Sequence, residues 1–346
     1  MTATVAVQSP CRLHFGLLSF PAADHWPNRV GRQTVPARRF GGVGLMVQTP
    51  GVRLTARPAP GWSAEGPLAE RALEYARQFA LATPPPEGSP PPPRHLVVEQ
   101  CPPEHAGLGT GTQLGLAVAR ALMVSWGVHD ADVVGLAQRV GRGTRSALGV
   151  HGFAQGGFLA EAGKGTAEAV APLVARLPFP QAWRIVLVLP RSDKGLHGTA
   201  ETRAFERLRD QGMPLARTDT LCRLVLLGML PALAEQDLPA FGEALHDFNC
   251  LAGEAFAAVQ GGTYASPRVA ELVAFIRGQG VRGVGQSSWG PTAFAVAEDE
   301  GHAEHLAARI REQFALGPEE VFTTSACNHG AVVEVSGRGG PGVSRG

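Results

Sequence analysis

A short glycine-rich segment, AGLGTGTQLGLAVARAL, opens a strongly apolar stretch and limits more than any other feature what this chain can fold into. Gly107, Gly109 and Gly111 let the backbone adopt positive φ and leave no Cβ between the main chain and a ligand. Residues 113–126, which follow, are apolar enough to predict a buried helix. The N–H groups of the loop and the positive end of the helix dipole converge on one point, where we predict an anion site.

The same segment admits a simpler interpretation, a glycine-rich helix start with Thr112 as the N-cap and no ligand. It is not a Walker A loop, because no GK[ST] follows, and it is not a dinucleotide-binding GxGxxG, because the third glycine is misplaced. The residues predicted to bind phosphate are Gly107, Leu108, Gly109, Thr110, Gly111, Thr112 and Gln113.

Composition and charge exclude several classes of protein. The chain has 346 residues with a net charge of +1, so neither a nucleic-acid footprint nor an acidic tail is present. Five scattered cysteines without a CxxC pair predict reduced thiols and no zinc or other metal site. The sequence shows no signal peptide and no membrane-spanning run, and we expect a cytoplasmic protein without a membrane partner.

The order of elements predicts an α+β protein of two domains, residues 1–178 and 179–335, with a disordered tail at 336–346. The proline-rich turn at 178–180 marks the boundary. Strands are expected at 4–8, 40–48, 52–56 (as the hairpin partner of 40–48), 95–100, 183–189, 292–297 and 331–335. Helices are expected at 64–82, 113–126, 131–141, 199–210, 218–233, 238–251 and 301–314.

Residues 102–112, followed by an Ala/Leu-rich helix, resemble the PxxxGLGSSAA phosphate loop of the GHMP superfamily of small-molecule kinases. Further segments resemble one family of that superfamily, the β-ribofuranosylaminobenzene 5′-phosphate synthases. These segments are SPCRLHFGL, RRFGGVGLMV, GRGTRSALGVHGFAQGGF and GVGQSSWGPTAFAV. The resemblance implies a two-domain GHMP-type fold with an N-terminal domain like that of a ribosomal protein and a C-terminal ferredoxin-like domain. The ligand would lie between them, over the glycine loop.

The resemblance also implies a reaction. This family joins an aryl carboxylic acid, 4-hydroxybenzoate or 4-aminobenzoate, to phosphoribosyl pyrophosphate and releases CO2 and pyrophosphate, in tetrahydromethanopterin biosynthesis. It implies Mg²⁺ with the pyrophosphate, no organic cofactor and a possible homodimer.

Two other functions stay open: an ATP-dependent GHMP small-molecule kinase, and a non-catalytic homologue that binds a phosphorylated metabolite. A GHMP kinase typically has a carboxylate shortly before its second Gly-Gly, whereas residues 148–151 read LGVH.

Several candidate site residues follow from these motifs. Arg12 and His14, one residue apart on an extended segment, face the same side, and Arg12 can clamp a phosphate or carboxylate with its fork. His151 is either catalytic or a buried, hydrogen-bonded histidine. Arg145 departs from the family pattern, which usually has small residues in this segment, and we interpret it as a surface charge only. The predicted substrate-binding residues are Arg39, Gly41, Gly42, Gln286, Ser287, Ser288 and Trp289, with Lys194 and His197 as further candidates.

Overall fold

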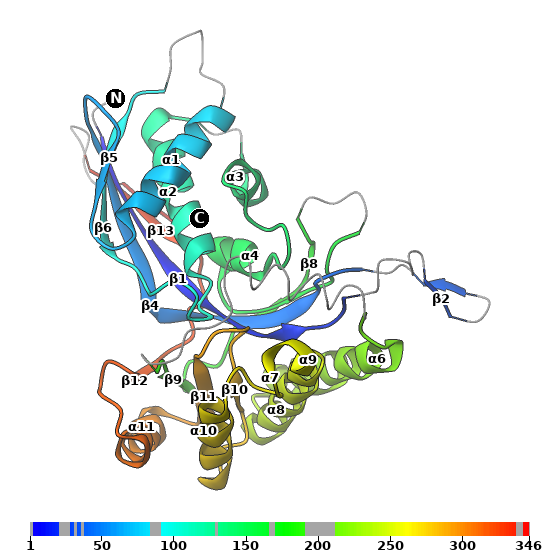
Figure 1. Ribbon diagram of the computed structural model, residues 1–346. Helices are drawn as coiled ribbons and strands as arrows, with labels where there is room; N and C mark the ends of the chain where they lie inside the picture. The colour runs from blue at the N-terminus through cyan, green and yellow to red at the C-terminus, as the bar shows by residue number, and fades with distance from the viewer. Residues whose placement is uncertain are drawn as a thin grey trace.

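The computed structural model describes residues 3–20, 28–30, 33–35, 38–83, 91–128, 131–165, 170–190, 212–336 and 342–345 (Figure 1). It is a mixed α+β structure, as the sequence predicts. Within the described part of the chain, no helix is both long and apolar enough to cross a membrane.

The first layer is an eight-stranded sheet with the strand order β14-β13-β1-β4-β6-β5, to which β7 and β8 are joined through β4. Its two long strands, β1 and β4, run antiparallel from the Val5–Ala56 pair to the Leu17–Gly42 pair. The strands are β1 Thr4–Leu17, β4 Gly42–Pro58, β5 Ser63–Glu65, β6 Arg94–Gln100, β7 Phe158–Glu161, β8 Leu173–Leu177, β13 Val332–Ser336 and β14 Gly342–Arg345. A separate small hairpin joins β2 Asn28–Val30 to β3 Gln33–Val35.

Four helices cover one face of this sheet: α1 Ala69–Ala82, α2 Thr110–Trp126, α3 Val133–Arg139 and α4 Leu148–Gln155 (Figure 1). The central one, α2, has hydrophobic residues nearly all round, and most of its side chains are buried. It packs against both β1 and β4, which fixes its first turn beside the middle of β1. This placement decides where the glycine loop lies.

The second layer is a four-stranded antiparallel sheet with the order β10-β11-β9-β12. Its strands are β9 Arg184–Val188, β10 Val284–Gln286, β11 Ala293–Ala297 and β12 Val321–Thr324. Helices between β9 and β10 and between β11 and β12 give the strand–helix–strand–strand–helix–strand order of a ferredoxin-like unit. Both faces of β9 are buried, because Val186 and Val188 pack with α10 Pro267–Gly278 and α11 Glu300–Phe314, while Ile185 and Leu187 face the other way.

That other face meets α8 Leu238–Glu254 and the second half of β1 in one hydrophobic cluster. Phe15 of β1 packs on Phe294 of β11 with ring centroids 4.9 Å apart, and on Phe158 of β7 at 6.2 Å. The remaining helices here are α6 Leu215–Arg223, the π-helical segment η2 Leu224–Met229, α7 Leu230–Glu235 and α9 Ala257–Gln260. The second layer therefore packs on strands of the first sheet, β1 among them.

Several predicted elements differ from the structure. Residues 52–56 are not a hairpin partner of 40–48, because β4 continues through both segments and each half pairs with β1. The strand predicted at 4–8 continues to Leu17 as β1, with a register shift between Ser9 and Cys11. The strand predicted at 331–335 as part of the second domain is β13, and it pairs with β1 in the first sheet. In the tail predicted to be disordered, Gly342–Arg345 forms β14 instead, paired with β13. The predicted helix at 199–210 lies outside the described residues, and the domain boundary at 178 stays a prediction.

Candidate active site

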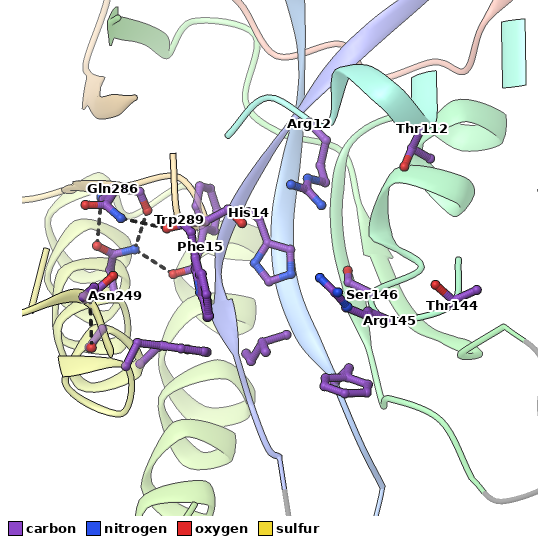
Figure 2. A pocket seen from close by; sticks show the side chains of 18 of the residues that line it. Arg12, His14, Phe15, Thr112, Thr144, Arg145, Ser146, Asn249, Gln286 and Trp289 are labelled. Atoms are coloured by element: carbon purple, nitrogen blue, oxygen red, sulfur yellow. Dashed lines mark hydrogen bonds between the residues drawn. The ribbon is translucent and has the colours of Figure 1, made fainter. Parts of the chain in front are cut away.

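A cavity of about 410 Å³ lies against β1 where the two layers meet. It receives side chains from β1, from the first turn of α2, from the 141–146 loop before α4, from α8 and from the turn after β10 (Figure 2). The polar and aromatic side chains that line it are Arg12, His14, Phe15, Phe40, Thr112, Arg142, Thr144, Arg145, Ser146, Asn249, Phe256, Gln260, Thr263, Gln286, Ser288 and Trp289.

Strand β1 brings Arg12 and His14 to the same cavity, as their spacing predicts. The backbone N–H of Arg12 donates to the carbonyl of Leu108 at 3.0 Å, so β1 and the glycine loop are directly bonded. His14 is buried, and burial followed by the nearby Arg12 charge lowers the pKa of its imidazole well below its usual range. The ring is therefore neutral in the middle of the cavity.

The glycine loop adopts the backbone that its sequence predicts. Gly107 and Gly109 have φ of 89° and 71°. A Cβ on Gly107 would lie 2.3 Å from the carbonyl oxygen of Ser287, and one on Gly109 would lie 3.3 Å from Arg12 Nε. Helix α2 begins at Thr110 with Gly109 as the N-cap, so the assignment of Thr112 as the N-cap is wrong. The side chain of Thr112 instead lines the cavity.

The N-terminus of α2 keeps donors available for an anion. The N–H groups of Thr112 and Gln113 donate to the carbonyl of Gly109, at 3.0 and 3.1 Å. Those of Thr110 and Gly111 form no hydrogen bond with any other described residue. They lie at the positive end of a 17-residue helix.

The turn after β10 closes the site from the second layer. The hydroxyl of Ser287 donates to the carbonyl of Gly107 at 2.7 Å and accepts from the N–H of His14 at 3.0 Å. The N–H of Ser288 donates to the carbonyl of His14 at 2.9 Å. Ser287 is fully buried and does not line the cavity, whereas Gln286, Ser288 and Trp289 do. Ser287 thus joins the glycine loop, β1 and this turn.

Asn249 of α8, which sequence reasoning missed, supports the same junction. Its amide nitrogen donates to the carbonyls of Phe15 at 2.6 Å and Gln286 at 2.9 Å, and its oxygen accepts from the N–H of Gln286 at 2.9 Å. A Cβ on Gly285 would lie 2.3 Å from that oxygen, which explains the glycine at this position. An asparagine on the otherwise apolar buried face of this helix was the available signal.

Other predicted residues lie elsewhere. The amide of Gln113 is buried, accepting from Ser9 Oγ and donating to the carbonyl of Gly149, both at 2.8 Å. His151 Nε2 is 2.8 Å from the carbonyl oxygen of Ala171 and does not line the cavity, as expected of a buried, hydrogen-bonded histidine.

Arg39, Gly41 and Gly42 are also outside the cavity lining. Arg39 exchanges backbone hydrogen bonds with Lys164. A Cβ on Gly41 would touch the Ala162 backbone, and one on Gly42 would lie 2.7 Å from the carbonyl oxygen of Gly16, so both glycines allow close strand packing. Lys194 and His197 lie outside the described residues.

The 141–146 loop contributes more than predicted. Arg142, Thr144, Arg145 and Ser146 all line the cavity, so Arg145 is not merely a surface charge. Burial, together with the charge of Arg71, lowers the pKa of Arg142 to about 10, which leaves it protonated at neutral pH. Two further cations therefore face the ligand.

Behind this loop lies a carboxylate that the sequence did not single out. Glu161 is fully buried at the end of β7, and its Oε2 accepts from the N–H of Ala147 at 2.7 Å. Burial raises the pKa of this carboxyl to about 7, while hydrogen bonds from Ser146 and Ala147 act in the opposite direction. Glu161 therefore holds the turn that carries Ser146, without lining the cavity itself.

The described residues contain no group of three or more His, Cys, Asp or Glu side chains that could hold a metal ion. The polar lining of the cavity is instead made of arginines, hydroxyls and amides. This donor set fits an anionic ligand directly and does not fit a metal held by the protein alone.

Comparison with known proteins agrees with this fold. Residues 68–157 match the GHMP kinases N terminal domain model, and residues 229–316 match the GHMP kinases C terminal model. Among solved structures, homoserine kinase from Cytophaga hutchinsonii superposes with a TM-score of 0.62 at 15% identity, covering 99% of this chain and 97% of that one. Mevalonate diphosphate decarboxylase from Staphylococcus aureus superposes with the same score at 13% identity, covering 97% and 99%. The chain belongs to the GHMP kinase superfamily.

Within that superfamily its relatives over almost the whole chain are synthases. A beta-ribofuranosylphenol 5'-phosphate synthase from Methanothermobacter thermautotrophicus is 28% identical, over 96% of this chain and 99% of the relative. The protein of the same name from Archaeoglobus fulgidus is 29% identical, over 95% and 99%. The resemblance seen in the motifs is confirmed: over almost its whole length the chain is similar to proteins named beta-ribofuranosylphenol 5'-phosphate synthase.

The buried Glu161 predicts how stability depends on pH. Because its folded-state pKa is raised from 4.5 to about 7, it stabilises the fold fully below the unfolded value, and this contribution is lost as pH rises through about 7. Glu161→Gln keeps the shape and an acceptor for Ala147 but cannot ionise. We expect the variant to be more stable than the wild type at about pH 8.5, by up to roughly 3 kcal/mol, with a small difference near pH 5.

Urea unfolding at both pH values measures this difference, and the exposed Glu235→Gln is the matched control. An equal stability difference between wild type and Glu161→Gln at the two pH values would contradict a raised pKa.

Proposed function

We propose that this protein joins an aryl carboxylic acid to phosphoribosyl pyrophosphate, forming a C-riboside 5′-phosphate and releasing CO2 and pyrophosphate. The bond between C1 of the ribose and the pyrophosphate oxygen breaks, and its electron pair leaves with pyrophosphate. A ring π pair of the acceptor forms the new bond to C1 from the carbon that bears the carboxylate. The bond to the carboxylate then breaks, its electron pair restores the aromatic ring, and CO2 leaves.

The observation that carries this proposal is that the cavity has two chemically different ends. In Figure 2, Arg12, Thr112, Thr144, Arg145 and Ser146 lie on one side of His14, while Phe15, Asn249, Gln286 and Trp289 lie on the other. The first end, together with the N-terminus of α2, supplies positive charge and hydroxyl donors. It suits a phosphorylated sugar.

The second end suits an aromatic acceptor. The rings of Phe256 and Trp289 meet edge to face with centroids 5.0 Å apart, and Phe15 adds apolar surface. The relatives are named for a ribofuranosylphenol product. We therefore take 4-hydroxybenzoate as the acceptor, with 4-aminobenzoate as the alternative and tetrahydromethanopterin biosynthesis as the pathway.

The neutral His14 between the two ends fits this chemistry. Departure of pyrophosphate leaves positive charge on the ribose ring, and a neutral imidazole can contact that ring without repelling it. The low pKa of His14 keeps the imidazole neutral across the physiological range. Mg²⁺ would arrive bound to the pyrophosphate as part of the substrate, and the arginines would neutralise the charge that the ion leaves uncompensated.

Incubation of the protein with phosphoribosyl pyrophosphate, Mg²⁺ and each aryl acid tests the proposal. Release of pyrophosphate and of CO2 from carboxyl-labelled acid should occur in equal amounts, and only when both substrates are present. Parallel reactions contain ATP with sugar or isoprenoid alcohols. Phosphoryl transfer from ATP without any CO2 release would replace the synthase by the kinase, and inactivity in both assays would favour the non-catalytic homologue.

Arg12 should be the charged side chain of β1 on which activity depends. Arg12→Ala should lower kcat/KM by a factor that corresponds to on the order of 1.5–3 kcal/mol of transition-state stabilisation. Arg12→Lys should still lose much of this stabilisation, because a lysine makes one contact where the arginine fork makes two. Steady-state kinetics on both variants, with circular dichroism to verify folding, measures the loss.

The matched control is Arg53→Ala on β4, whose side chain is half exposed and 3.9 Å from Glu99. Wild-type kinetics in Arg12→Ala would remove Arg12 from the site.

A further inference from the structure

We propose that Arg142 holds the departing pyrophosphate, in an anion subsite that it forms with the first turn of α2. The inference rests on the proposed function and adds to it which arginine binds the pyrophosphate. Neither the glycine-loop motif nor the expected role of Arg12 says which residues bind the 5′-phosphate of the substrate and which bind its pyrophosphate.

The position of Arg142 over the helix N-terminus is the first argument. A Cβ on Gly111 would lie 3.4 Å from Arg142 Nη2 and 3.4 Å from the hydroxyl of Tyr75. The guanidinium carbon lies 5.0 Å from the centroid of the Tyr75 ring, which supports its plane. The guanidinium thus lies beside Gly111 in the first turn of α2, and Arg142 also lines the cavity.

The positive charge of Arg142 also favours a bound anion. Arg142 is half-buried, yet among the described residues no carboxylate forms an ion pair with it, and its buried Nε has no hydrogen-bond partner. The neighbouring cation, Arg71, is compensated by Glu74 at 3.2 Å and Glu104 at 3.9 Å. A partly desolvated cation beside a helix N-terminus, without its own carboxylate, is stabilised by a bound anion.

The third argument is the direction of the reaction. The acceptor ring must approach C1 from the side opposite the leaving group, and the aromatic end lies across His14 from Thr112, which stands in the first turn of α2 (Figure 2). The leaving group then belongs at the α2 end. As the C1–O bond breaks, negative charge accumulates on the pyrophosphate oxygens. A planar guanidinium that donates hydrogen bonds to two of these oxygens stabilises that charge.

Calorimetric titration of the folded full-length protein with pyrophosphate and, separately, with ribose 5-phosphate tests the assignment. Arg142→Ala should weaken pyrophosphate binding by roughly 10- to 100-fold, the range for loss of a charge-assisted hydrogen bond, and ribose 5-phosphate binding by less than about 3-fold. Arg142→Lys should weaken pyrophosphate binding by a smaller factor. The matched control Arg139→Ala, in the last turn of α3 and outside the cavity, should change neither affinity.

Pyrophosphate affinity unchanged in Arg142→Ala, while the wild type binds it, would overturn this inference and leave the proposed function standing. Equal losses for the two ligands would overturn it as well, because Arg142 would then serve both phosphates alike. A wild type that binds neither ligand would remove the proposed function and the subsite together. Should Arg142→Ala fail to fold, the lysine variant decides, since it preserves the charge.

Discussion

The buried hydroxyl of Ser287 is the interaction on which the site depends. It donates to the carbonyl of Gly107 and accepts from the N–H of His14, so three segments far apart in sequence are joined at one atom. The junction tolerates no bulk, because a Cβ on Gly290 would lie 2.3 Å from the backbone of the glycine loop. Anything that displaced Ser287 would break both of these hydrogen bonds and loosen the turn after β10 from the glycine loop and from β1.

Around this junction the positive charges lie at one end of the cavity. The α2 end gathers arginines and hydroxyls, while His14 stays neutral because it is buried beside Arg12. Glu161, the buried carboxylate behind the loop, is bonded to the turn that carries Ser146 and does not line the cavity, so the charged side chains that line the cavity are all arginines. The site is therefore prepared for a phosphorylated anion at one end and for an aromatic ring at the other.

The parts of the site that could be predicted from sequence are those set by local conformation. Glycines at positive φ, an apolar helix after them, and the i, i+2 pair Arg12 and His14 depend only on neighbouring residues. Local sequence could not identify Arg142, Asn249 and Glu161 as residues of the site, because their roles come from packing between distant elements. The hairpin predicted at 52–56 was wrong for a related reason: pairing with β1 carries β4 straight through the expected turn.

The most direct test of the account is a crystal structure of the protein with a non-hydrolysable phosphoribosyl pyrophosphate analogue, Mg²⁺ and 4-hydroxybenzoate. The account predicts pyrophosphate oxygens within hydrogen-bond distance of Gly111 N–H and Arg142, and the acceptor ring against Trp289, with His14 between the two ligands. The aryl acid at the α2 N-terminus, or the pyrophosphate at the aromatic end, would contradict it.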